Sequence, residues 1–262
     1  AAQETAPREI AFNTDGTKMF VVGNTGDDVN EYILSTGFDV STASFVDSFS
    51  VAAQDATPQG LAFSTDGTKM FIVGAAGDAV YEYTLSTGFD VSTASFVDSF
   101  SISAQDVNPL GIAFNTDGTK MFVVGTSLGN VNEYTLSTGF DVSTASFVDN
   151  FSVAAQDTNA NGITFNTDGT KMFIVGQAGR AVNEYTLSIG FDVSTASFVD
   201  SFSVAAQETA PYGIAFNTEG TKMFISGNTG DSVYEYTLAG VNAIPTGYQP
   251  VHTTASIDST YW

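Results

Sequence analysis

A unit of 51 residues, repeated five times without insertion or deletion, constrains this chain more than any other feature. The string Phe-(Asn/Ser)-Thr-(Asp/Glu)-Gly-Thr-Lys-Met-Phe begins at the same place in each copy, at Phe12, Phe63, Phe114, Phe165 and Phe216. The repeats are therefore 1–51, 52–102, 103–153, 154–204 and 205–238, and the sequence of 239–262 is unrelated to them. A period of this length is typical of proteins in which each repeat is one supersecondary unit packed against its neighbours.

Each of the first four repeats carries the signals of four strands, the fifth carries the first three, and none shows helical periodicity. In the second copy, runs rich in apolar, β-branched or aromatic residues cover 60–63, 69–73, 80–85 and 95–102. The Asp66-Gly67 pair between the first two runs is a hairpin-turn signal, and a longer loop precedes the fourth run. Four antiparallel strands in a unit of about 50 residues are typical of a propeller blade. We therefore predict an all-β, five-bladed β-propeller built from five four-stranded repeats. All 22 phenylalanines occupy repeat positions, and we expect them to be buried between the sheets.

The last repeat is incomplete in sequence. Fourth-strand sequences occur only at 45–51, 96–102, 147–153 and 198–204, and the period would place the fifth at 249–255. A blade without its fourth strand would expose an open sheet edge. We therefore expect the tail, 239–262, to supply the last strand of blade five or to link onward. The alternative is self-assembly, in which a neighbouring molecule donates that strand.

The start of each blade resembles a known family. YVTN and lactonase-like propellers begin their blades with a sequence similar to 58–74, which reads Pro-Gln-Gly-Leu-Ala-Phe-Ser-Thr-Asp-Gly-Thr-Lys-Met-Phe-Ile-Val-Gly. The resemblance extends over all five repeats and implies the propeller fold. Lactonase-like enzymes place single-copy catalytic groups in the central funnel, and we find no matching set in this sequence. The longer loop Ser-Thr-Gly-Phe-Asp-Val-Ser-Thr-Ala-Ser-Phe resembles repeats of uncharacterised marine bacterial and marine phage proteins. This second resemblance implies an extracellular, cell-surface or virion-surface location.

The composition narrows the class of partner. With 7 basic and 29 acidic residues, the chain has a formal net charge of −22 at pH 7, and it should repel phosphate backbones and anionic lipid. We therefore expect no nucleic-acid partner and no membrane insertion. The chain has no cysteine and a single histidine, His252, which leaves no thiol chemistry, no His-cluster metal site and no Ser-His relay inside the repeats. We predict that the chain is not an enzyme and uses no cofactor.

Differences between the five copies fall mainly at one end of the predicted blades. In an antiparallel blade, this end carries the second–third loop and the start of the innermost strand; we call it the variable face. Its side chains include types that stack on sugars or make directional hydrogen bonds. The candidate ligand-binding residues at the start of the innermost strand are Arg8, Gln59, Leu110, Asn161 and Tyr212. The candidates in or just after the second–third loops are Asp27, Asp78, Asn130, Arg180, Asp231, Asn30, Tyr81, Asn132, Asn183 and Tyr234.

Two sets of acidic residues recur in the copies. The first set, in the loops between blades, is Glu4, Asp55, Asp106, Asp157 and Glu208. Turn capping is the structural interpretation of these acids, and Ca²⁺ ligation is the alternative. The second set lies in the middle of the third strand of each repeat and comprises Glu31, Glu82, Glu133, Glu184 and Glu235. A buried acid needs a partner, so we expect these glutamates to be paired.

These observations support one functional hypothesis and one alternative. The hypothesis is a non-catalytic, surface-located propeller that recognises a glycan or a protein surface through the variable face. The alternative is a structural repeat subunit of a fibre, an appendage or a virion decoration.

Overall fold

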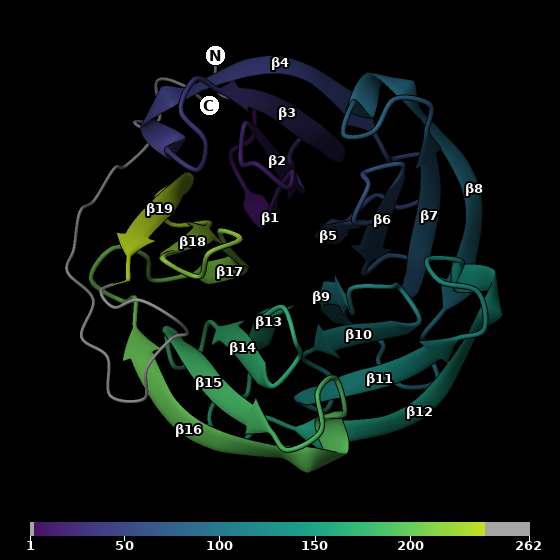
Figure 1. The fold of residues 1–262 in the computed structure, drawn as a ribbon, viewed down its shortest axis with the longest axis vertical. Helices are drawn as coiled ribbons and strands as arrows, with labels where there is room; N and C mark the ends of the chain where they lie inside the picture. The colour runs from purple at the N-terminus through teal and green to yellow at the C-terminus, as the bar shows by residue number, and fades with distance from the viewer. Residues whose placement is uncertain (1–2, 239–262) are drawn as a thin grey trace.

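Each repeat folds into one antiparallel sheet, and five sheets surround a common axis as the blades of a β-propeller (Figure 1). The structure is a computed structural model and describes residues 3–238. Within these residues, four blades have four strands and the fifth has three. The predicted fold class is confirmed, and the segment expected to complete the fifth blade, 249–255, lies outside the described residues.

The strands follow the same order in every blade, from the innermost to the outermost. Blade one contains β1 (Pro7–Phe12), β2 (Lys18–Gly23), β3 (Asp28–Leu34), the 3₁₀ turn η1 (Val40–Thr42) and β4 (Ala43–Ser50). Blade two contains β5 (Pro58–Phe63), β6 (Lys69–Gly74), β7 (Ala79–Leu85), η2 (Val91–Thr93) and β8 (Ala94–Ser101). Blade three contains β9 (Pro109–Phe114), β10 (Lys120–Gly125), β11 (Asn130–Leu136), η3 (Val142–Thr144) and β12 (Ala145–Ser152). Blade four contains β13 (Ala160–Phe165), β14 (Lys171–Gly176), β15 (Ala181–Leu187), η4 (Val193–Thr195) and β16 (Ala196–Ser203). Blade five contains β17 (Pro211–Phe216), β18 (Lys222–Gly227) and β19 (Ser232–Thr237).

Glycine is required in the turn between the first two strands. In blade two, Gly67 has a φ of +70°, which a side chain strains. The Asp66 carboxylate accepts hydrogen bonds from the Thr68 backbone N–H (3.0 Å) and hydroxyl (2.8 Å), which stabilises the turn. A Cβ on Gly67 would also lie 2.2 Å from the ring of Phe89. The absence of a side chain therefore lets the long loop fold back over the turn.

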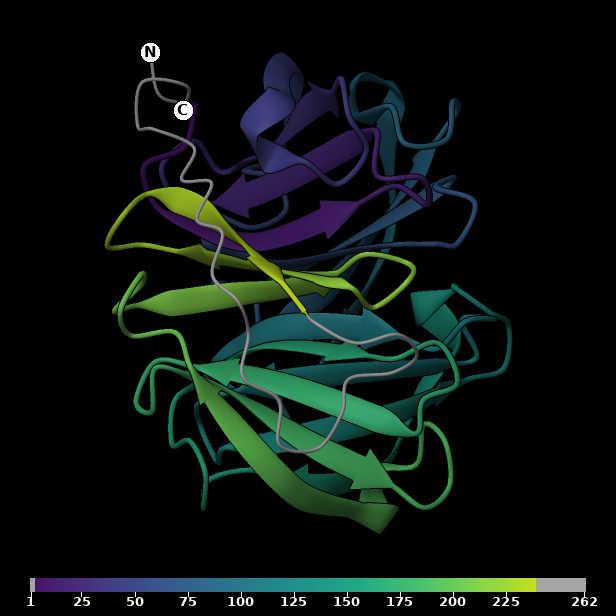
Figure 2. The ribbon, with the colours of Figure 1, turned by 60° about the vertical axis from the view of Figure 1, so that its left-hand side comes forward.

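The apolar core lies between neighbouring blades. Phe20 of blade one packs against Phe63 and Phe89 of blade two, with ring centroids 4.6 and 6.2 Å apart. Phe224 of blade five packs in the same way against Phe12 and Phe38 of blade one, at 4.5 and 6.3 Å. The last blade therefore closes the ring on the first. Figure 2 shows the twisted sheets of neighbouring blades stacked against one another.

The most exposed phenylalanines lie near the start of the outermost strands. The prediction that every phenylalanine lies between sheets is wrong for the first phenylalanine of each outermost strand, which is 39–44% exposed: Phe45, Phe96, Phe147 and Phe198. The second phenylalanine of the same strands is partly buried and packs against the next blade, as Phe100 does against Tyr134 with ring centroids 5.7 Å apart.

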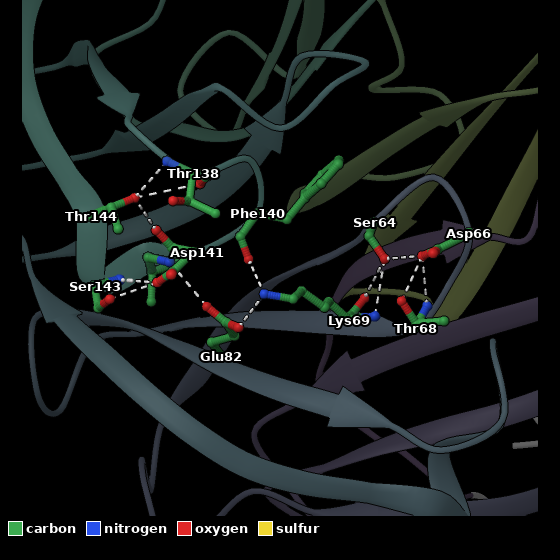
Figure 3. A network of polar contacts seen from close by, with 11 residues as sticks. Ser64, Asp66, Thr68, Lys69, Glu82, Thr138, Phe140, Asp141, Ser143 and Thr144 are labelled. Carbon is green, nitrogen blue, oxygen red and sulfur yellow. Dashed lines mark hydrogen bonds and ion pairs between the residues drawn. The ribbon is translucent and has the colours of Figure 1, made fainter.

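Within residues 3–238, a lysine and a glutamate of blades one, two, three and five hold the long loop of the next blade. In blade two, the Lys69 ammonium lies 2.6 Å from the Glu82 carboxylate and donates to the Phe140 carbonyl of blade three at 2.7 Å. The other Glu82 oxygen accepts from the Val142 N–H at 3.0 Å. Figure 3 shows this contact, which we call the loop clasp. It confirms the expectation that the mid-strand glutamates are paired.

The loop clasp also operates where the ring closes. Lys222 of blade five lies 2.6 Å from Glu235 and donates to the Phe38 carbonyl of blade one at 2.7 Å. Glu235 accepts from the Val40 N–H at 3.3 Å. The same two residues of the repeat therefore join blades that are adjacent in sequence and blades that are joined only by closure.

The described helical segments are single 3₁₀ turns, so none of them is long and apolar enough to cross a membrane.

Candidate binding site

The predicted residues at the start of the innermost strands surround the axis of the ring, but their environments differ. Arg8, Gln59 and Tyr212 are partly exposed. Leu110 and Asn161 are only 9% and 2% exposed. Asn161 donates to the Pro211 carbonyl at 2.8 Å and so links blade four to blade five. The accessible polar groups of this set are therefore contributed by blades five, one and two.

These accessible groups form a contiguous cluster. The Arg8 guanidinium lies over the ring of Tyr212, 4.0 Å from its centroid, which is cation–π geometry. Asn24, in the β2–β3 loop, satisfies its amide when its oxygen accepts from Arg8 Nη2 (3.2 Å) and Gln59 Nε2 (3.2 Å). In the same orientation its nitrogen donates to the Pro58 carbonyl. We call Arg8, Asn24, Gln59 and Tyr212 the Arg8 cluster.

The candidates just after the second–third loops are mostly buried. Asn30, Tyr81, Asn132 and Asn183 are 1–8% exposed, and Tyr234 is partly buried. The Tyr81 hydroxyl donates to Asp55 at 3.3 Å, and the Asn30 amide donates to Asp28 at 2.8 Å. In blades one and two, the side chain at this position therefore stabilises the second–third loop through a hydrogen bond and is not available to a ligand.

The loop candidates adopt an unusual backbone conformation. Four of them have φ between +46° and +51°: Asp27, Asp78, Arg180 and Asp231. The residue in this conformation in blade three is Gly129 (φ +61°), so Asn130 lies one position further on, at the start of β11. Arg180 is exposed and the three aspartates are partly exposed. These residues lie on the same face as the Arg8 cluster, because each second–third loop lies beside the start of its innermost strand.

The acids between the blades are buried turn caps. Asp55 is 2% exposed and accepts from the backbone N–H groups of Thr57 (2.8 Å) and Gly77 (2.9 Å). Glu208 accepts from the N–H groups of Ala210 (2.7 Å) and Gly230 (3.1 Å). Glu4 and Asp157 make equivalent contacts, whereas Asp106 accepts from the Asn108 N–H and from the Ser127 hydroxyl, both at 2.7 Å. These contacts fix the second–third loops in position.

A buried acid on the axis was missed by the sequence analysis. Glu9 occupies the place where the other blades have glycine, at Gly60, Gly111, Gly162 and Gly213. The innermost strands approach closely at this level: a Cβ on Gly60 would lie 2.6 Å from the Leu110 carbonyl oxygen of the next blade. Glu9 is 4% exposed, and one of its oxygens accepts from the N–H groups of Ile10 (3.1 Å) and Ile214 (3.0 Å). The Glu9 carboxyl therefore joins blade one to blade five.

A second exception to the repeat lies opposite Glu9. Ser226 replaces the valine found in the other four copies, at Val22, Val73, Val124 and Val175. Its hydroxyl donates to the Arg8 carbonyl at 2.9 Å and accepts from the Gly213 N–H at 3.1 Å. The larger residue in blade one thus faces a smaller one in blade five. Comparison of the copies within the strands would have revealed both, because each occurs once among five.

We expect Glu9 to make stability depend on pH. Burial raises the pKa of Glu9 well above its ordinary value of 4.5, against the opposing effect of two backbone N–H groups. At a pH between the pKa of Glu9 in the unfolded chain and its pKa in the folded chain, Glu9 carries a proton in the folded chain but has lost it in the unfolded chain. The contribution of Glu9 to the free energy of unfolding is therefore fully present below pH 4.5 and is lost as the pH rises through the folded pKa.

Glu9→Gln tests this expectation, because glutamine keeps the shape but cannot ionise. Urea unfolding from pH 5 to pH 8 should show the wild type losing stability relative to the variant as the pH rises. Parallel pH profiles for the two proteins would contradict the expectation.

Comparison with known proteins finds solved structures with a similar fold but low sequence identity. No protein-family model and no curated protein matches the sequence. A solved protein from Lactobacillus plantarum is 10% identical, with a TM-score of 0.59 over 97% of this chain and 72% of that chain. A protein from Bacteroides uniformis, provisionally named a 6-phosphogluconolactonase, is 14% identical, with a TM-score of 0.57 over 95% and 71%. A periplasmic gluconolactonase from Pseudomonas aeruginosa is 15% identical, with a TM-score of 0.53 over 96% and 72%.

These similarities confirm the resemblance to lactonase-like propellers and correct one prediction. The prediction that the chain is not an enzyme is wrong as an exclusion, because proteins named as lactonases have a similar fold over 71–72% of their length. The acidic composition and the single histidine do not separate binding propellers from catalytic ones. The resemblance of the long loop to marine bacterial and phage repeats stays a prediction.

Proposed function

We propose that the propeller recognises a sugar-like polar ligand, such as the exposed end of a glycan, at the Arg8 cluster. The observation that carries this proposal is the partly exposed Arg8 guanidinium stacked on Tyr212 at 4.0 Å, beside Asn24 and Gln59. Five equivalent positions around the axis carry five different residues, and the accessible polar ones are adjacent.

The chemistry of the cluster suits sugar hydroxyls. An aromatic ring offers a face to the C–H groups of a sugar, and amide and guanidinium groups donate in fixed directions. The contacts within the cluster hold Arg8 and Gln59 in place before a ligand arrives, which lowers the entropic cost of binding. The loop residues Asp27, Asp78 and Asp231 are partly exposed on the same face and in the same three blades, and they add acceptors for further hydroxyl groups. Recognition at a cell or virion surface is the setting that we propose for this ligand.

Tyr212→Ala and Arg8→Ala test the proposal. After a glycan array has identified a ligand, each substitution should weaken its binding about tenfold, because stacking and directional hydrogen bonds contribute about 1 kcal/mol each. Arg180→Ala is the matched control, since Arg180 is an exposed arginine of the same face outside the cluster. Equal effects of Arg8→Ala and Arg180→Ala would show that only net charge matters, and unchanged binding in Tyr212→Ala would exclude the cluster.

A second candidate function is lactone hydrolysis. It is favoured by the solved propellers that are named as lactonases and by the buried acid, Glu9, next to Arg8 in the innermost strand. Acid release from glucono-δ-lactone above the rate in buffer, lost in Glu9→Gln and in Arg8→Ala, would support this function. A rate equal to that of buffer would exclude it for this substrate.

A further inference from the structure

The opposite face of the propeller contains a cavity of about 590 Å³. It lies where the innermost strands end, on the face of the first–second turns and away from the Arg8 cluster. Its lining includes the last residue of all five innermost strands: Phe12, Phe63, Phe114, Phe165 and Phe216. A volume of this size is typical of small-molecule sites.

The walls of the cavity are aromatic. The five strand-end phenylalanines are partly exposed, and Phe38, Phe89 and Phe191 of the long loops also line the cavity. Neighbouring rings hold one another in place; Phe165 and Phe191, for example, have centroids 5.4 Å apart and are tilted by 46°. Rings fixed in this way need no further ordering when a ligand enters.

The mouth of the cavity is acidic. The turn of every blade contributes a carboxylate to this face: Asp15, Asp66, Asp117, Asp168 and Glu219. Asp168 and Glu219 line the cavity itself. Hydrogen bonds from the Thr170 hydroxyl and backbone lower the pKa of Asp168, so it is ionised at neutral pH. Lys171 also lines the cavity, but its ammonium lies 2.7 Å from Glu184.

One residue breaks the symmetry of the cavity. Thr164 precedes Phe165 in β13, and the other four copies have alanine there. Thr164 is partly exposed and lines the cavity, and within residues 3–238 its hydroxyl makes no hydrogen bond. It is therefore available to a hydroxyl group of a ligand.

We infer that this cavity binds a small organic cation, such as a quaternary ammonium compound, through cation–π contacts with the phenylalanine rings. The occupant follows from charge complementarity: aromatic faces attract cations, and the acidic mouth and the net charge of −22 favour a cation over an anion. The inference concerns the opposite end of the axis from the Arg8 cluster and does not depend on the proposed function.

Two probes of the same shape test the charge requirement. Choline and 3,3-dimethylbutan-1-ol differ only in having nitrogen or carbon at the branched centre, so only choline is charged. Isothermal titration calorimetry of the full chain in 150 mM salt should show choline binding at least tenfold more tightly than the alcohol, and benzyltrimethylammonium binding more tightly than choline. Failure of both cations to bind, or equal binding of choline and the alcohol, would overturn the inference.

Three variants locate the bound cation. Phe165→Leu removes one ring but keeps an apolar side chain and should weaken choline binding several-fold. Thr164→Ala restores the residue of the other four blades, so it should fold normally, and it should weaken choline but not tetramethylammonium, which lacks a hydroxyl. Glu219→Gln, in an exposed turn, should weaken both cations. Binding that persists unchanged in Phe165→Leu would show attraction to surface charge only and would refute the cavity site.

Discussion

Replacing Phe71 with alanine is expected to lower the free energy of unfolding by about 3–5 kcal/mol, the usual cost of deleting a buried aromatic ring. The Phe71 side chain is fully buried between blades two and three, where its ring centroid lies 4.4 Å from that of Phe114 and 6.1 Å from that of Phe140. Alanine would leave a void between two sheets whose backbones are held by their own hydrogen bonds. Urea-induced unfolding followed by circular dichroism measures the loss.

Phe96→Ala is the matched control in the same blade. Phe96 lies on the outermost strand and is 44% exposed, with an edge contact to Tyr83 at 5.8 Å. Its removal should cost less, about 1 kcal/mol, because almost half of its surface stays in water and its loss leaves no closed void. If the two substitutions cost the same, the stability of the ring would not depend on packing between the blades.

The contrast between these two residues shows where the sequence was informative. The period and the Asp-Gly turns predicted the number of blades and the order of strands, because turn geometry and strand alternation are local properties. The exposure of Phe96 was not predicted, because a phenylalanine in an outer strand looks the same in sequence as one in an inner strand. Even within β8, Phe96 is exposed whereas Phe100 packs against Tyr134 of the next blade, so the packing between blades decides which ring is covered.

The candidate site was predicted in part. Comparing the copies placed Arg8, Gln59 and Tyr212 on one face, and the structure brings them together with Asn24. The same comparison selected Asn132 and Asn183, which are buried. In sequence, a difference between copies that adjusts the packing beneath a loop cannot be distinguished from a difference that adjusts the binding of a ligand.

The cavity was missed for a different reason. Its rings, such as Phe12 and Phe165, occur in every copy, and a search for differences cannot find a site built by symmetry. Glu9 was missed because the copies were compared at the loops and at the first positions of the innermost strands, and not at the position that follows Arg8. The role of Glu9 in joining blade one to blade five follows from its contact with Ile214 and its position opposite Ser226. These residues come close to Glu9 only when the ring closes.

The largest electrostatic effect is expected at the loop clasp. Glu82 is buried, whereas its partner Lys69 reaches solvent at one end, with side-chain exposures of 3% and 31%. Lys69→Met would leave a buried carboxylate without its counter-charge and the Phe140 carbonyl without a donor, and should cost about 3–5 kcal/mol. Arg180→Met removes the same charge from an exposed loop and should cost less than about 1 kcal/mol.

A double-mutant cycle separates the energy of the Lys69–Glu82 interaction from the effect of changing the net charge of the protein. Adding Glu82→Leu to Lys69→Met removes the buried charge as well, so the double variant should be more stable than the sum of the single losses implies, by about 1–3 kcal/mol. The Val142 N–H still loses its acceptor in the double variant, so recovery should be incomplete. Additive losses would mean that Lys69 and Glu82 act independently, and the loop clasp would then be a contact between blades without energetic coupling. Incomplete recovery, by contrast, would identify the backbone contacts to the next blade as the part of the clasp that hydrophobic side chains cannot replace.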